Sequence, residues 1–158
     1  MLGLFKKKKV IEFKAPVSGA TVDLVDLPDQ VFAGKMVGDG VAFQPDQGVL
    51  YAPISGVVVQ VFPTKHAIGL RTKEGLEVLI HIGLDTVEMK GEGFKAFVQP
   101  NQQVQAGEKL MEFDLNLIAE RGKSILTPLI ITNMAAVKEL KLYYGLVTPE
   151  TTVMEVRI

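Results

Sequence analysis

Residues 52–82 read APISGVVVQVFPTKHAIGLRTKEGLEVLIHI, and their pattern indicates the class of fold. It holds three runs rich in β-branched and aliphatic residues, at 56–62, 68–72 and 78–82. Pro63 and Gly75 fall between the runs, where each residue type favours a turn. Short β-type runs at this spacing predict strands of a sandwich or a barrel.

The same pattern extends to the rest of the chain. Further β-type runs occupy 21–25, 40–43, 109–114 and 153–158. Only two segments have helical character: 116–121, which ends before Gly122, and 134–140, which follows Asn133 as a plausible N-cap. The sequence therefore predicts an all-β protein with one or two short helices.

A five-residue turn occurs twice. APVSG at 15–19 recurs as APISG at 52–56, and each copy leads into a β-type run. Proline fixes φ and glycine permits an unusual backbone conformation, so each copy predicts a tight turn. The repeat predicts two similar β-units folded face to face in one antiparallel sandwich. No low-complexity linker separates them, which predicts a single domain.

Composition excludes several classes of protein. The chain has 158 residues, a formal net charge of −1 and no cysteine. The charge gives no basis for nucleic acid binding, and the lack of cysteine excludes disulfides and thiolate metal sites. We expect a cytoplasmic protein with a flexible N-terminal tail over 1–12 and one domain over 13–158.

The N-terminal sequence MLGLFKKKK also predicts weak contact with the inner face of the membrane. Leu2, Leu4 and Phe5 would insert into lipid while Lys6 to Lys9 meet anionic headgroups, at about 1 kcal/mol per lysine. The alternative is a solvated, frayed end.

The two histidines, His66 and His81, are the strongest chemical signal. Neighbouring strands can bring both imidazoles together, and such a pair in a protein without cysteine indicates phosphoryl transfer or metal binding. Thr64 can orient one ring through its hydroxyl, and Gly83 would let backbone N–H groups approach a bound phosphoryl group. The alternative is two unrelated histidines, one in the core and one on the surface.

Longer motifs carry a family resemblance over nearly the whole chain. They are PDQVFAGKMVGDGVAFQP at 28–45, PTKHAI at 63–68, HIGLDTVEMKGEGF at 81–94, FDL at 113–115 and LTPLIITN at 126–133. With the two APxSG turns, they resemble the glucose-class IIA phosphocarriers of the bacterial sugar phosphotransferase system. The resemblance implies a duplicated barrel-sandwich hybrid that acts as a phosphotransferase component. It also implies transfer from the histidine phosphocarrier protein to a cysteine of a sugar-permease IIB domain.

The resemblance also assigns roles to individual residues. His81 matches the phosphorylated histidine, His66 its partner imidazole, and Thr64 the threonine that orients the partner. The residues matched to partner docking are the acidic Asp29 and Asp85 and an apolar collar of Phe32, Val37, Phe62 and Val87. Some family members also regulate other proteins, so regulatory targets are further expected partners. No cofactor is required, although zinc held by His66 and His81 and completed by a partner remains an alternative.

Two other functions use related β-sandwiches. A zinc peptidase would need further ligands, but Gly83 and Leu70 stand where a histidine and an aspartate would be expected. A biotinyl or lipoyl carrier would use Lys90 of Glu88-Met89-Lys90, but Gly91 follows where methionine is expected.

Overall fold

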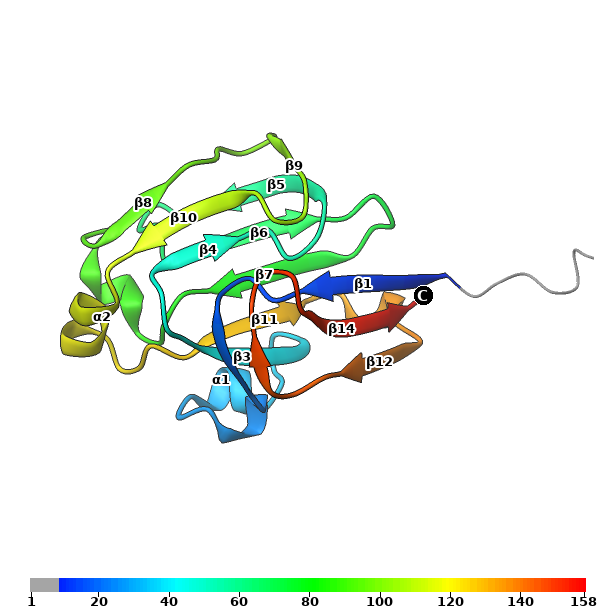
Figure 1. Ribbon diagram of the computed structural model, residues 1–158, viewed down its shortest axis with the longest axis horizontal. Coiled ribbons are helices and arrows are strands. Elements are labelled where there is room, and N and C mark those ends of the chain that lie inside the picture. The colour runs from blue at the N-terminus through cyan, green and yellow to red at the C-terminus, as the bar shows by residue number, and fades with distance from the viewer. Residues whose placement is uncertain (1–8) are drawn as a thin grey trace, which may run out of the picture.

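Strands dominate the computed structural model, which describes residues 9–158 (Figure 1). One eight-stranded sheet has the order β13-β2-β3-β11-β7-β6-β5-β9, and two three-stranded sheets have the orders β1-β14-β12 and β4-β10-β8. The strands are β1 (Val10–Lys14), β2 (Gly19–Val22), β3 (Asp39–Pro45), β4 (Val49–Tyr51), β5 (Gly56–Val61), β6 (Ala67–Arg71), β7 (Glu77–His81), β8 (Phe94–Ala96), β9 (Gln103–Val104), β10 (Lys109–Phe113), β11 (Thr127–Ile131), β12 (Glu139–Leu142), β13 (Leu146–Val147) and β14 (Thr152–Arg157). All pairings between these named strands are antiparallel, as the sequence predicts.

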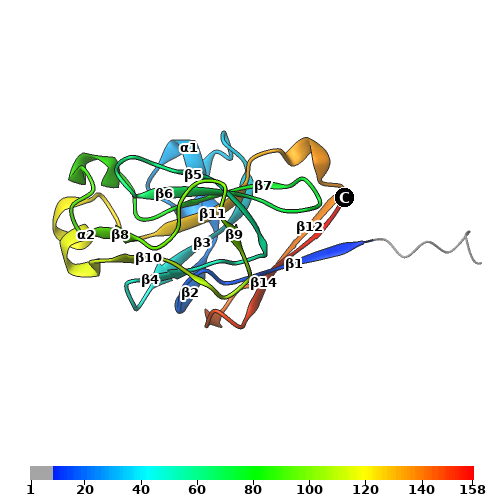
Figure 2. The ribbon, with the colours of Figure 1, turned by 90° about the horizontal axis from the view of Figure 1, so that it is seen from above.

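Helices are short and lie between strands. They comprise α1 (Gln30–Ala33), α2 (Leu115–Arg121) and the 3₁₀ turns η2 (Leu24–Asp26), η3 (Thr86–Met89) and η4 (Met134–Ala136). Figures 1 and 2 place α2 at the end of the molecule opposite to the C-terminus. Within residues 9–158, no helix has the length and apolar character needed to cross a membrane.

One predicted helix is confirmed and the other is wrong. The Asp114 side chain accepts a hydrogen bond from the Leu117 N–H at 3.0 Å, which starts α2 close to the predicted residue. The segment 134–140 instead forms one 3₁₀ turn and then β12, because pairing with β14 overrides local helix propensity. Asn133 makes no side-chain cap; its amide bonds the Glu77 N–H and the Gly75 carbonyl of the β6–β7 hairpin, at 2.8 and 2.9 Å.

The two APxSG turns contact each other reciprocally. Lys14, just before the first turn, donates its N–H to the Pro53 carbonyl at 2.8 Å. Tyr51, just before the second turn, donates its N–H to the Pro16 carbonyl at 2.7 Å. The exchange relates the two halves of the chain symmetrically, in agreement with the predicted duplication.

The predicted boundary at residue 13 is wrong. β1 begins at Val10 and pairs with β14, and Ile11 is buried in the main core. Lys9 forms an ion pair with Glu74 at 3.2 Å. Residues 10–12 are therefore part of the fold, whereas the membrane contact predicted for Leu2, Leu4, Phe5 and Lys6 to Lys8 falls outside the described residues.

Two apolar clusters fill the interior. The larger is built around fully buried side chains such as Phe13, Phe43 and Leu70. The smaller joins six residues from η2 and its C-cap, α1, β3, β11 and the segment after β7: Leu24, Leu27, Phe32, Ala42, Leu84 and Ile130. Burying each large apolar side chain contributes roughly 1.5–3 kcal/mol. The smaller cluster thereby fixes α1 against the end of β7, where His81 lies.

Candidate active site

The register between β6 and β7 brings the two histidines together. Ala67 pairs with His81, and the Ile82 N–H donates to the His66 carbonyl at 2.7 Å. The two imidazole centroids are 4.8 Å apart, with an angle of 75° between the rings. The alternative of two unrelated histidines is therefore wrong.

One backbone hydrogen bond fixes the tautomer of His81. Its Nδ1 lies 2.7 Å from the Gly83 carbonyl oxygen. A carbonyl can only accept, so Nδ1 carries the proton and donates it. In the neutral ring, Nε2 then keeps its lone pair and is available as a nucleophile.

His66 is held by the hydroxyl of Thr64. Thr64 Oγ1 and His66 Nδ1 are 2.5 Å apart, as expected for a residue that orients the ring. Phe62 packs edge-on against His66 at 5.5 Å between centroids, and Phe32 contacts His81 at 5.2 Å. When Thr64 donates to Nδ1, the proton of His66 lies on Nε2, which can then donate to an oxygen bound between the rings.

Burial keeps both imidazoles neutral at neutral pH. It lowers the pKa of His66 from 6.5 to about 4, with repulsion from His81 acting in the same direction. Burial also lowers the pKa of His81, although the hydrogen bond to Gly83 and the charges of Asp29 and Asp85 oppose the shift. A neutral His81 has the free lone pair that nucleophilic attack requires.

The two aspartates lie in different local structures. Asp29 is the N-cap of α1, and its Oδ1 accepts the Val31 N–H at 2.9 Å. Asp85 is exposed, has a left-handed backbone with φ of 57°, and makes no side-chain cap of η3. Both carboxylates act electrostatically on His81, so the structure places them beside the site.

The apolar collar is only partly exposed. Val37 and Val87 are 36% and 48% exposed, and Phe62 is half-buried. Phe32 is buried at 7% and belongs to the smaller core cluster, so the expectation of exposure is wrong for this residue. Its ring instead packs against that of His81, with an angle of 58° between the two rings.

Sequence reasoning missed two exposed apolar residues near α1. Val31 lies in α1 and is 42% exposed, and Met36 follows α1 and is 73% exposed. The sequence signal that could have identified them is their position within the motif at 28–45, where they are close in sequence to Asp29 and Val37. They add exposed apolar area to the segment that also carries Asp29 and Val37.

Gly83 has a different role from the one expected. Its N–H donates to the Thr127 hydroxyl at 3.3 Å and does not face an open site. Its φ is +70°, and a Cβ would lie 2.6 Å from Thr86 Cγ2. Glycine is therefore required by backbone conformation and close packing.

The histidine pair is an incomplete metal site. His66 and His81 offer two imidazole ligands, but residues 9–158 contain no cluster of three or more His, Cys, Asp or Glu side chains arranged to hold a metal ion. A tetrahedral zinc ion would need its remaining ligands from another molecule.

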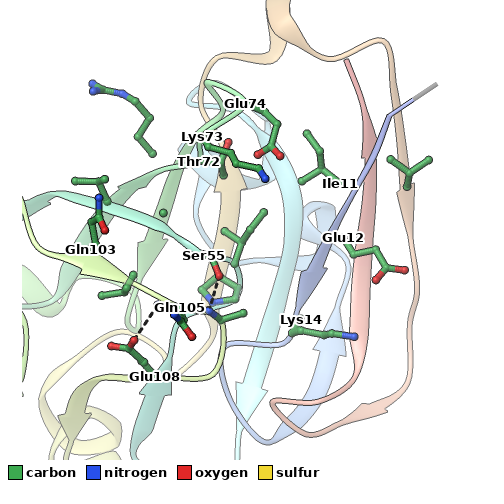
Figure 3. A pocket seen from close by; sticks show the side chains of 18 residues that line it. Ile11, Glu12, Lys14, Ser55, Thr72, Lys73, Glu74, Gln103, Gln105 and Glu108 are labelled. Carbon is green, nitrogen blue, oxygen red and sulfur yellow. Dashed lines mark hydrogen bonds between the residues drawn. The ribbon is translucent and has the colours of Figure 1, made fainter. Parts of the chain in front are cut away.

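A separate groove lies away from the histidines. A cavity of about 860 Å³ separates β1 from the β5 and β9 edge, where Ser55 and Glu108 accept backbone hydrogen bonds from Ala106 and Gln105 (Figure 3). Neither histidine lines this groove. The histidine pair is thus separate from this groove.

Comparison with known proteins agrees with this geometry. Residues 11–137 match the family described as phosphoenolpyruvate-dependent sugar phosphotransferase system, EIIA 1. A glucose-specific EIIA component of Bacillus cereus is 48% identical over 158 residues, covering 99% of this chain and 96% of the relative. A glucose-specific EIICBA component of Staphylococcus saprophyticus is 52% identical over 124 residues, which cover 78% of this chain but 18% of that longer protein.

The fold is also shared with a solved relative. The structure of glucose permease IIA from Mycoplasma capricolum superposes with a TM-score of 0.89 at 42% identity, covering 93% of this chain and 96% of that one. These matches support a phosphocarrier role in the sugar phosphotransferase system, and they favour it over the peptidase and the biotinyl or lipoyl alternatives. The chain belongs to the EIIA 1 family of the phosphoenolpyruvate-dependent sugar phosphotransferase system.

Proposed function

We propose that Nε2 of His81 accepts a phosphoryl group from the histidine phosphocarrier protein and passes it to a cysteine of a sugar-permease IIB domain. The observation that carries this proposal is the hydrogen bond from His81 Nδ1 to the Gly83 carbonyl, at 2.7 Å. It leaves the Nε2 lone pair of a neutral ring free for attack on phosphorus.

Both transfers balance without another reactant. In the first, the Nε2–P bond forms as the donor's N–P bond breaks, and the electron pair of that bond returns to the donor imidazole. In the second, a cysteine thiolate attacks phosphorus, and the Nε2–P electron pair returns to His81. Nδ1 keeps its proton throughout, and the Gly83 carbonyl stabilises the positive charge that develops on the ring.

His66 is the second group in the proposed mechanism. With its centroid 4.8 Å from that of His81, it is close enough to bond an oxygen of a phosphoryl group on Nε2. Although the pKa of His66 is about 4 in the unmodified protein, a nearby phosphoryl dianion would raise it. His66 would then bind the phosphoryl group partly as a cation, and Thr64 would orient the ring.

Partner proteins are proposed to dock on the surface around the histidines. Val37 and Val87 offer exposed apolar area, and Asp29 and Asp85 would pair with basic residues of a partner. A transient complex of modest area would exclude water and limit hydrolysis of the phosphohistidine. Zinc is no part of this reaction; His66 and His81 would hold it only when a partner supplies further ligands.

The test is phosphate acceptance by His81→Gln. The variant is incubated with phosphoenolpyruvate, the general first enzyme of the system and the histidine phosphocarrier protein. We expect no labelling of His81→Gln, labelling of the matched variant His66→Gln, and an Nε2 phosphohistidine in the parent protein by NMR. Undiminished labelling of the His81 variant would refute the assignment.

A further inference from the structure

Two buried threonine hydroxyls hold the backbone immediately after His81. Thr127 and Thr86 are both fully buried. The Thr127 hydroxyl accepts the Gly83 N–H at 3.3 Å and donates to the Ile125 carbonyl at 3.0 Å. The Thr86 hydroxyl donates to the Ile82 carbonyl at 2.6 Å. The peptide group between Ile82 and Gly83 is therefore held at both ends by side chains.

Pairing between β11 and β7 does not hold the backbone beyond His81. β11 is paired with β7 as far as Leu129 opposite Ile80. Continuing the same register would place Pro128 opposite His81, and proline has no N–H to donate. The ladder ends there, and the hydroxyl of Thr127 supplies a polar partner for the chain beyond β7.

Gly83 needs such restraint because of what its carbonyl does. The carbonyl belongs to the next peptide group, whose Leu84 N–H donates to the Ser124 carbonyl at 2.8 Å. A glycine with φ of +70° joins the two peptide groups. Because glycine has no Cβ, it restricts their relative rotation less than any other residue would. With both peptide groups held in this way, the Gly83 carbonyl faces His81 Nδ1 at 2.7 Å.

We infer that Thr127, assisted by Thr86, is a positioning residue that selects the tautomer of His81. Its hydroxyl fixes the peptide before Gly83, the Gly83 carbonyl then holds the proton on Nδ1, and Nε2 remains the nucleophile. The consequence for phosphoryl transfer rests on the proposed function, whereas the consequence for the tautomer of the unmodified protein does not.

The experiment is ¹⁵N NMR of the His81 ring in the full chain, beside the initial rate of labelling. Thr127→Val keeps the shape and removes the hydroxyl. We expect the parent protein to carry its proton on Nδ1, and the variant to show a mixture of both tautomers with labelling about 10–100-fold slower. Thr127→Ser should restore the tautomer and the rate.

A matched control removes a similar hydroxyl far from the histidines. Thr72 is also buried, and its hydroxyl accepts the Leu76 N–H at 3.1 Å in the β6–β7 hairpin. Thr72→Val should leave the His81 tautomer unchanged. An equal change in this control, or an unchanged tautomer in Thr127→Val, would overturn the inference.

A second pair of variants decides the matter if Thr127→Val does not fold. Thr127→Ala and Thr127→Ser both lose the methyl group and differ only in the hydroxyl. The inference predicts the parental tautomer in the serine variant and a mixture in the alanine variant; identical spectra would overturn it. Absence of phosphohistidine in the parent protein would refute the proposed function while leaving the tautomer result standing.

Discussion

Replacing Gly83 with alanine should destabilise the fold far more than the same change at another glycine of similar conformation. At φ of +70°, an L-residue costs roughly 1–2 kcal/mol. The new Cβ would also lie 2.6 Å from Thr86 Cγ2 and 2.9 Å from the Ser124 carbonyl oxygen. The backbone oxygen cannot move without breaking the Leu84 N–H bond, so overpacking adds about 1–3 kcal/mol.

The sum is a loss of about 2–5 kcal/mol, or roughly 4–20 °C in melting temperature for a chain of this size. Gly75 is the matched control because its φ is +95° and a Cβ there would meet no atom within 4 Å. Gly75→Ala carries the conformational cost alone, about 1–2 kcal/mol.

Urea unfolding of both variants, followed by circular dichroism, measures the difference directly. The contact argument requires Gly83→Ala to lose at least about 1 kcal/mol more than Gly75→Ala. Equal midpoints for the two variants would show that packing around Gly83 is loose, and the reasoning would fail.

Three further predictions concern the histidines and their surroundings. His66→Gln should still be labelled but should pass phosphate on about 10²–10³ times more slowly, because an amide cannot carry positive charge; a normal transfer rate to a IIB domain would contradict this. His66 should also make stability depend on pH: its folded pKa of about 4 lies below the unfolded value of 6.5, so its contribution is complete above pH 6.5 and is lost as pH falls towards 4. Up to about 3 kcal/mol of the free energy of unfolding should be lost over that pH window. When this free energy is measured by urea unfolding at a series of pH values, His66→Gln should depend less on pH in this range than the parent protein does. Parallel curves for the two proteins would refute the shift. Val37→Glu should change the free energy of unfolding by no more than about 0.5 kcal/mol while slowing phosphate exchange with donor and acceptor. The control Val10→Glu, at 40% exposure on β1, should leave phosphate exchange unchanged. A large fall in melting temperature for Val37→Glu would exclude a docking role.

The sequence predicted the segments whose pattern is local. Residues 56–62, 68–72 and 78–82 became β5, β6 and β7 with small shifts at their ends, because turns at Pro63 and Gly75 separate them. The strand expected at 21–25 instead ends at Val22, because the Asp23 carboxylate accepts the Val25 N–H and starts η2.

Elements that depend on distant partners were not predictable in the same way. β11 is central in its sheet and entirely buried, yet Pro128 within it argues locally against a central strand. α1 has only four residues, too few to show helical periodicity, and Asp29 was its one signal.

The site shows the same division. The pairing of the histidines follows from a hairpin that the sequence encodes, whereas Thr127 acts on Gly83 across 44 residues of chain. A single hydroxyl at that separation leaves no pattern in the sequence. The burial of Phe32 was also hidden, since it depends on packing against residues of β3 and β11.

The pairing of β1 with β14 has a consequence for how such a domain can be tethered. Val10 lies opposite Arg157, so the two ends of the fold leave it side by side, and Figure 1 shows the end of β7 on the opposite side. A covalent linker at either end would therefore leave the histidines open to a partner. A short flexible linker gives an effective concentration in the millimolar range, so weak docking would suffice for a tethered partner. The same fold can thus serve a freely diffusing carrier or one arm of a multidomain chain, without any change around the two histidines.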